Sequence, residues 1–238
     1  MPYYYGFDWT YLVIVLPCLL LSMWASSSVN STFKKYSKIA SSRSLTGAEA
    51  AQRVLSANGV RGVRIERVSG NLTDHYDPKT NVIRLSDSVH SSTSVAAIGV
   101  ACHEAGHAVQ YAQNYGPIKL RAAIIPVTNI GSKLAMPLII AGILFSFLGN
   151  LSYGLVYLGI ACFSLSLVFQ LVTLPVEFNA SRRAIETIES SGLLTEAEQL
   201  GAKKTLKAAA MTYVAATAVA LAQLVRLLVL FGGRRRRD

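Results

Sequence analysis

The chain has 238 residues, of which 52% are hydrophobic and only 15% charged, and its mean hydropathy is +0.38. Soluble domains usually carry about 25% charged residues, so the composition disfavours a soluble enzyme and favours a membrane protein with one modest soluble domain. The net charge of +10 would suit either nucleic acid or an anionic membrane surface. The three cysteines are odd in number and scattered, so we expect no disulfide framework.

The positions of the basic residues decide between nucleic acid and membrane. Residues 1–33 contain none, 34–121 contain twelve, 182–207 contain five, and 234–237 are four consecutive arginines. These blocks border hydrophobic runs, as membrane-flanking residues do, whereas a nucleic-acid protein usually interleaves basic residues with aromatics or places them along one helix face. We therefore expect a lipid bilayer as a partner and no nucleic acid.

The first hydrophobic run extends from about Trp9 to Ala25, near the lower limit for a helix that crosses a bilayer. Its N-terminal flank is aromatic and lacks the basic residues of a signal peptide. A cleavage signal is the alternative, because Ala25-Ser26-Ser27 is similar to a small-residue cleavage site. The favoured interpretation is an uncleaved transmembrane anchor over residues 1–25.

The polar block 26–121 predicts a small domain. Thr46 is a suitable N-cap for a helix that ends near Asn58, and alternation over 63–68 predicts a half-buried strand. A second strand is expected over 82–85, either as an edge strand to which an extended peptide adds or as part of a hairpin that covers the core. A helix then runs from about Ser92 to Asn114.

Two strong hydrophobic runs, 124–148 and 153–174, are joined by four uncharged residues. Such a short connection predicts an antiparallel helical hairpin in the membrane, which we assign to 122–174. Its first helix carries Lys133, so its membrane portion is expected to begin near Leu134.

The remaining chain divides into a polar segment, 175–207, and a hydrophobic helix with a basic tail, 208–238. The polar segment is expected to be mostly helical, with a break at Gly192. Gln223 and Arg226 interrupt the hydrophobic helix and argue against an ordinary lipid-facing span. The side on which the arginine run emerges is left open.

The sequence His103-Glu104-Ala105-Gly106-His107 has the HExxH pattern. On a helix, both imidazoles lie on one face and can bind the same zinc ion, while Glu104 can act as general base on a water molecule. A chance occurrence is the alternative. It is disfavoured because the surrounding helix, 95–109, is strongly apolar, and two histidines with an ionised glutamate would be costly to bury there without partners.

A catalytic zinc site needs a third protein ligand. The remaining histidines, His75 and His90, are candidates, and Glu177 is the best acidic one. His75 could instead stabilise an oxyanion, and Glu177 could be a solvated residue in the first turn after Pro175. Spacing alone leaves these alternatives open.

Four segments carry a resemblance to a known family, in this order along the chain: 31–37, 74–78, 101–110 and 175–184. They resemble the YugP-type membrane zinc metallopeptidases of bacteria, which are related in site layout to the HtpX and CAAX-prenyl protease group. The resemblance implies a zincin-like catalytic domain over 26–121 and a gluzincin-like site that Glu177 completes. Asn179 departs from the family pattern, in which we expect Asp, but an Asn can still orient a ligand through hydrogen bonds.

We therefore expect a mainly α protein with a small β-hairpin or sheet, in which multi-pass membrane helices accompany the zincin-like domain. The expected function is an integral-membrane zinc endopeptidase that acts on membrane-associated or damaged polypeptides, with His103, His107 and Glu177 binding Zn2+ and Glu104 as general base. The alternative is a catalytically silent membrane scaffold or metal-binding partner that retains the motif. A membrane-protein partner or a second copy of the chain is compatible with either.

The expected location is the bacterial inner membrane, with the site facing the cytoplasm. Two spans separate the polar blocks, so both blocks lie on one side. The N-terminus and the loop 149–152 lack Lys and Arg, so the opposite side is the outer one.

Overall fold

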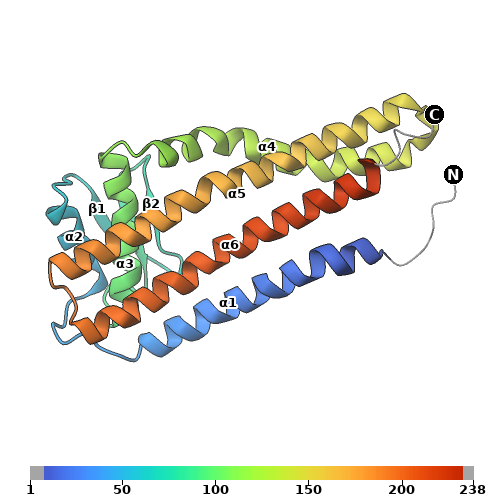
Figure 1. The fold of residues 1–238 in the computed structure, drawn as a ribbon. Coiled ribbons are helices and arrows are strands. Elements are labelled where there is room, and N and C mark those ends of the chain that lie inside the picture. Colours follow the sequence, from blue (N-terminus) through green and yellow to red (C-terminus); the bar gives the residue numbers. More distant parts are fainter. Residues whose placement is uncertain (1–7, 233–238) are drawn as a thin grey trace. The chain divides into compact units, whose positions relative to one another are not determined.

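The computed structural model describes residues 8–232, which are mainly helical and include one small sheet (Figure 1). The arginine run 234–237 and the aromatic residues before Asp8 lie outside the described residues. A π-helix, η1 (Tyr11–Val15), leads directly into α1, and a 3-10 turn, η2 (Ser146–Leu148), precedes α5. The other elements are α1 (Leu16–Tyr36), α2 (Gly47–Ala57), β1 (Arg64–Val68), β2 (His75–Asp77), β3 (Val82–Ser86), α3 (Val95–Ala112), α4 (Gly116–Leu144), α5 (Asn150–Ser190) and α6 (Glu196–Gly232).

Four helices of the described chain are long and apolar enough to cross a membrane, and they begin at Tyr11, Gly116, Asn150 and Glu196. The expected fold class, mainly α with a small sheet and several membrane helices, is confirmed. The chain folds as two compact units. We call residues 1–24, 121–172 and 213–238 the membrane unit, and residues 25–120 and 173–212 the site unit.

In the membrane unit, α4 and α5 form a closely packed antiparallel pair (Figure 1). A Cβ atom added to Gly142 would lie 2.8 Å from the Ser152 carbonyl oxygen, and one added to Gly159 would lie 2.8 Å from that of Ala135. Small residues allow this approach, because helices in a bilayer associate through packing and polar contacts. The two helices therefore form an antiparallel hairpin, and each is long and apolar enough to cross a membrane.

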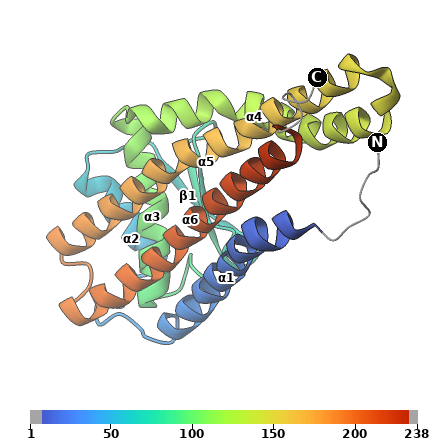
Figure 2. The same cartoon turned by 45° about the vertical axis from the view of Figure 1, so that its right-hand side comes forward.

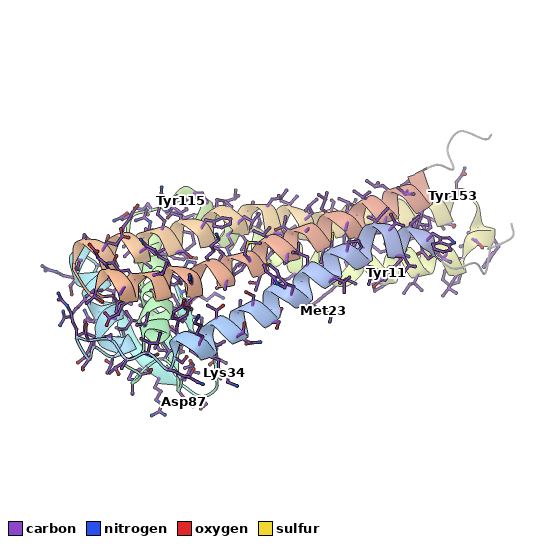
Figure 3. All side chains as sticks on the ribbon, turned by 60° about the horizontal axis from the view of Figure 1, so that its bottom comes forward. Tyr11, Met23, Lys34, Asp87, Tyr115 and Tyr153 are labelled. Carbon is purple, nitrogen blue, oxygen red and sulfur yellow. The ribbon has the colours of Figure 1, made fainter. Side chains whose placement is uncertain are left out.

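In the membrane unit, large apolar side chains are exposed, whereas a charged side chain is half-buried and paired. Large apolar side chains such as Met23, labelled in Figure 3, and Phe147 are 68% and 77% exposed, as expected for surfaces in contact with acyl chains. Arg226 is half-buried, donates from Nε to an Asp8 carboxylate oxygen at 3.0 Å, and lies over the Tyr11 ring. The basic side chain that argued against a span is thus paired.

The site unit contains a three-stranded sheet in the order β1-β3-β2, with β1 parallel and β2 antiparallel to β3. The hypothesis of an edge strand at 82–85 is wrong, because β3 is the central strand and its residues are almost all buried. The sequence reasoning also did not predict β2, which covers only three residues. Helix α3 packs against α2, β2 and β3 (Figure 2).

Local signals explain where the helices of the site unit begin. Thr46 and Glu49 form a capping box at the start of α2, in which the Thr46 hydroxyl accepts from the Glu49 N–H and the Glu49 carboxylate accepts from the Thr46 N–H. Ser94 caps α3 by accepting from the Ala97 N–H. Gly192 adopts a positive φ of 55° between α5 and α6, at the expected break.

Helix α5 continues through Pro175 instead of stopping near it. The alternative that Glu177 occupies a solvated first turn is therefore wrong, since Glu177 lies well inside the helix and is 2% exposed. Likewise α6 joins the end of the polar segment to the hydrophobic run without interruption.

Candidate metal centre

Two helices of the site unit bring three potential metal ligands together. His103 and His107 lie one turn apart on α3, and Glu177 projects from α5. One Glu177 carboxylate oxygen, Oε2, is 3.3 Å from His103 Nε2 and 3.5 Å from His107 Nε2. One ligand atom from each of these side chains lies within 4.8 Å of the others.

This geometry fits a zinc ion. Two donors that each lie about 2.0–2.1 Å from a tetrahedral ion are separated by about 3.4 Å. The observed distances of 3.3 and 3.5 Å agree with that separation. Two imidazole nitrogens and a carboxylate oxygen are also the donor set of many catalytic zinc sites.

The centre is deeply buried. Glu177 is 2% exposed, His107 8% and Glu104 9%. Carboxylates in such surroundings are costly unless a cation or hydrogen-bond donors compensate them. A bound divalent cation would provide that compensation.

Glu104 directly follows His103 on α3 and is not one of the converging ligands. Burial lowers the pKa of His107, but the hydrogen bond with Glu177 and the charges of Glu104 and Glu177 outweigh it and raise that pKa above its ordinary value. The Glu104 carboxylate therefore acts electrostatically on the same imidazole that faces Glu177.

The close approach of α3 and α5 depends on Gly106. A Cβ atom on this residue would lie only 2.7 Å from the carbonyl oxygen of Ala180. The middle of the motif thus packs against α5 one turn beyond Glu177, which places the carboxylate within reach of both imidazoles. The small residues of the motif serve helix packing here, in addition to leaving space around the centre.

Each imidazole has a hydrogen-bond partner on its other ring nitrogen. Ser181 Oγ lies 3.1 Å from His103 Nδ1, and Gln110 Oε1 lies 3.0 Å from His107 Nδ1. Sequence reasoning missed both roles. The available signals were spacing: Gln110 follows His107 by three residues and Ser181 follows Glu177 by four, so each faces the same side of its helix as the ligand.

The structure does not bring His75 or His90 into the cluster. His75 is exposed on β2 and contacts the Thr73 carbonyl, while His90 contacts the Ser91 hydroxyl. Neither belongs to the group of converging ligand atoms found among residues 8–232. Glu177 is the candidate that the fold places beside both histidines.

Asp74 is a further carboxylate near Glu104 that the sequence reasoning did not single out. It accepts hydrogen bonds from the Ser86 N–H at 2.7 Å and the Ser86 hydroxyl at 3.0 Å. Burial raises the pKa of Asp74, the hydrogen bonds from Ser86 oppose the rise, and the Glu104 charge adds to it. The two carboxylates therefore share one electrostatic environment.

Comparisons with known proteins agree with zinc as the metal. A model of the family described as "Putative neutral zinc metallopeptidase" matches residues 11–232. The chain is also 48% identical over 221 residues to "Putative membrane protease YugP" of Bacillus subtilis (strain 168), which covers 93% of this chain and 96% of that protein. No solved structure matches the chain. The residues matched by the family include every side chain of the candidate metal centre.

Proposed function

The chain belongs to the neutral zinc metallopeptidase family, and from this premise we propose that it is an integral-membrane endopeptidase. In this proposal His103, His107 and Glu177 bind the zinc ion, and Glu104 acts as general base and then as general acid. The observation that carries the proposal is the convergence of two imidazole nitrogens and a buried carboxylate oxygen within 4.8 Å. Membership of the family indicates that the cofactor is Zn2+.

When bound, the zinc supplies a Lewis acid that polarises the scissile carbonyl and lowers the pKa of a water molecule. Glu104 takes a proton from the attacking water and returns it to the leaving amine, so that the peptide bond breaks and no net proton is consumed at the carboxylate. His103, His107 and Glu177 would hold the ion through two imidazole nitrogens and one carboxylate oxygen. The burial of His107, Glu177 and Glu104 limits bulk water around the reacting groups.

The proposed substrates are membrane-associated or damaged polypeptides, and the proposed location is the bacterial inner membrane with the site unit in the cytoplasm. The choice of substrates rests on the sequence, in which Glu177 follows the hydrophobic run 153–174 by three residues. A site that follows a membrane-spanning run so closely in the chain suits polypeptides at the membrane surface.

Glu104→Gln tests the role of the base. This variant should keep the zinc content of the wild type and lose at least about 100-fold in hydrolysis of an unfolded protein substrate by the purified protein in detergent, because the proton acceptor is gone. Zinc content is measured by elemental analysis. Unchanged hydrolysis would contradict the mechanism, and a wild type that binds zinc without hydrolysing any of a panel of unfolded and membrane-bound polypeptides would favour the silent metal-binding protein.

Glu177→Ala tests the third ligand. We expect loss of bound zinc, and zinc should no longer raise the thermal unfolding midpoint as it does in the wild type. Glu186→Ala is the matched control, because Glu186 lies on the same helix with an exposed side chain that pairs only loosely with Arg182 at 3.8 Å. Full zinc occupancy in Glu177→Ala would remove Glu177 from the ligand set.

A further inference from the structure

Gln110 is a fully buried polar residue on α3, and the proposed reaction assigns it no role. Its side chain is 0% exposed and makes three hydrogen bonds. Oε1 lies 3.0 Å from His107 Nδ1, and Nε2 donates to the Val176 carbonyl at 2.8 Å and to Asn179 Oδ1 at 3.0 Å. One amide therefore connects a candidate ligand on α3 with the residues on either side of Glu177 on α5.

The direction of these hydrogen bonds follows from their partners. The Arg183 guanidinium can only donate, and its Nε lies 2.7 Å from Asn179 Oδ1, so this Asn179 atom is an acceptor. The Val176 carbonyl is an acceptor as well. The Gln110 atom that faces both must then be the NH2 group, which leaves Oε1 facing His107. Because Oε1 can only accept, His107 Nδ1 must carry the hydrogen.

We propose that Gln110 is a positioning residue that holds His107 in the tautomer with Nδ1 protonated and Nε2 free for the metal, and that it fastens the helix carrying Glu177 to the HExxH helix. This inference rests on the proposed ligand set. Arg183 and the Val176 carbonyl fix which atoms donate and which accept in this chain of hydrogen bonds. Asn179 connects Arg183 to Gln110. Such outer partners orient a ligand and tune its basicity.

His103 differs from His107 in this respect. Its partner, the Ser181 hydroxyl, can rotate to donate or accept, so it does not impose a tautomer. Ser181 also lies on the same helix as Glu177, and its hydroxyl contacts His103 and not Gln110. Ser181→Ala is therefore a matched variant that removes one imidazole partner without breaking the connection between Gln110 and α5.

The Asn at position 179 is explained by the same chain. Its Oδ1 accepts from both Gln110 and Arg183, and an aspartate would offer an acceptor at the same place. Asn179→Asp should therefore preserve the direction of the hydrogen bonds from Gln110 and Arg183. Asn179→Leu removes the acceptor while keeping a similar volume, and it leaves Gln110 with the Val176 carbonyl alone to orient its NH2 group.

The experiment compares four variants in a Glu104→Gln background, where no hydrolysis is needed for the readout. The zinc dissociation constant is measured by competition with a chromogenic chelator, and the visible spectrum of the Co2+-loaded protein reports ligand geometry. Gln110→Met, which keeps the volume and removes the amide, should weaken zinc binding by about 10–100-fold and shift the Co2+ spectrum. Asn179→Leu should change both in the same direction, whereas Asn179→Asp and Ser181→Ala should stay closer to the parent than either.

The thermal midpoint of the metal-free protein separates positioning from simple packing. If Gln110 only fills the core, Gln110→Met lowers that midpoint but leaves the zinc dissociation constant within twofold of the parent, and the proposal is overturned. If Gln110→Met does not fold, the comparison of Asn179→Leu with Asn179→Asp decides. A zinc dissociation constant of Asn179→Leu within twofold of the parent then overturns the proposal. A parent protein whose zinc binding does not depend on Glu177 would instead overturn the ligand set, and with it the role of Gln110.

Discussion

At the scale of single residues, a methyl group added at Gly106 tests whether helix packing supports zinc binding while every proposed ligand is kept. In Gly106→Ala the new Cβ meets the Ala180 carbonyl, whose nearest approach of 2.7 Å is too short, so α5 must move away from α3. Because Glu177 lies on α5, it moves with that helix. We therefore expect weaker zinc binding together with a lower thermal midpoint, although all three ligands and Glu104 remain. Chelator competition and thermal unfolding measure the two effects.

Gly99→Ala is the matched control, since Gly99 lies on the same helix about two turns earlier. A Cβ there would be 3.4 Å from Ala202, which is ordinary contact distance. We expect near-parental zinc affinity and, because Ala favours a helix interior over Gly by up to about 1 kcal/mol, no loss of stability. Equal zinc affinity in Gly99→Ala and Gly106→Ala would contradict the packing argument.

The residues that could be predicted from sequence are those in fixed local spacing. His103, Glu104 and His107 stand together in one motif, and one helix suffices to place them on one face. The role of Glu177 needed a family resemblance, because its separation of 74 residues from His103 carries no geometric information without the fold. Gln110 was missed because two of its three partners lie on α5, and hydrogen bonds between distant segments leave no periodic signal.

At the scale of elements, α2 tests how local capping supports the site unit. The Thr46–Glu49 capping box satisfies backbone N–H groups at the start of the helix, and α2 packs against α3. Thr46→Ala should lower the free energy of unfolding by about 1 kcal/mol. Zinc affinity of the folded protein should not change, because α2 supplies none of the ligands. Denaturant unfolding measures the first effect and chelator competition the second.

Ser56→Ala provides the comparison for this prediction. Ser56 is exposed near the end of the same helix, where alanine is a better helix former than serine. It should therefore be neutral or slightly stabilising. A loss in Ser56→Ala as large as that in Thr46→Ala would show that capping is not the cause.

Element boundaries were predictable where a residue has a distinct local role and not where tertiary packing overrides it. Thr46 and Gly192 mark real boundaries through side-chain capping and a positive φ. Pro175 does not, because α5 continues through it from Asn150 to Ser190. The order of the strands likewise follows from long-range pairing between β1 and β3, which the alternating pattern of each strand alone does not specify.

At the scale of the whole molecule, the membrane unit indicates where the far end of α6 lies. Tyr157, near the start of α5, donates from its hydroxyl to the Phe231 carbonyl at 3.2 Å, and Arg226 pairs with Asp8 at the start of the first helix. The end of α6 therefore lies at the same end of the membrane unit as the beginnings of the first helix and of α5. This favours a full span for α6 over a re-entrant segment.

Charge then gives the orientation. The seventeen basic residues in 34–121 and 182–207 outnumber the four arginines in 234–237, while 149–152 contains none. The positive-inside rule places the larger group in the cytoplasm. We accordingly expect the loop 149–152 and the end of α6 outside, and the site unit inside, even though the short arginine run opposes this arrangement.

Single cysteines test that topology in a background where Cys18, Cys102 and Cys162 are replaced by alanine. In intact cells, a membrane-impermeant maleimide should label Asn150→Cys and Gly232→Cys, whereas Ser56→Cys on α2 should react only after permeabilisation. All three positions are exposed, so access and not burial decides labelling. Labelling of Ser56→Cys in intact cells would place the metal centre outside. Protection of Gly232→Cys until permeabilisation, with Asn150→Cys labelled, would mean that α6 returns to the cytoplasmic side and does not span.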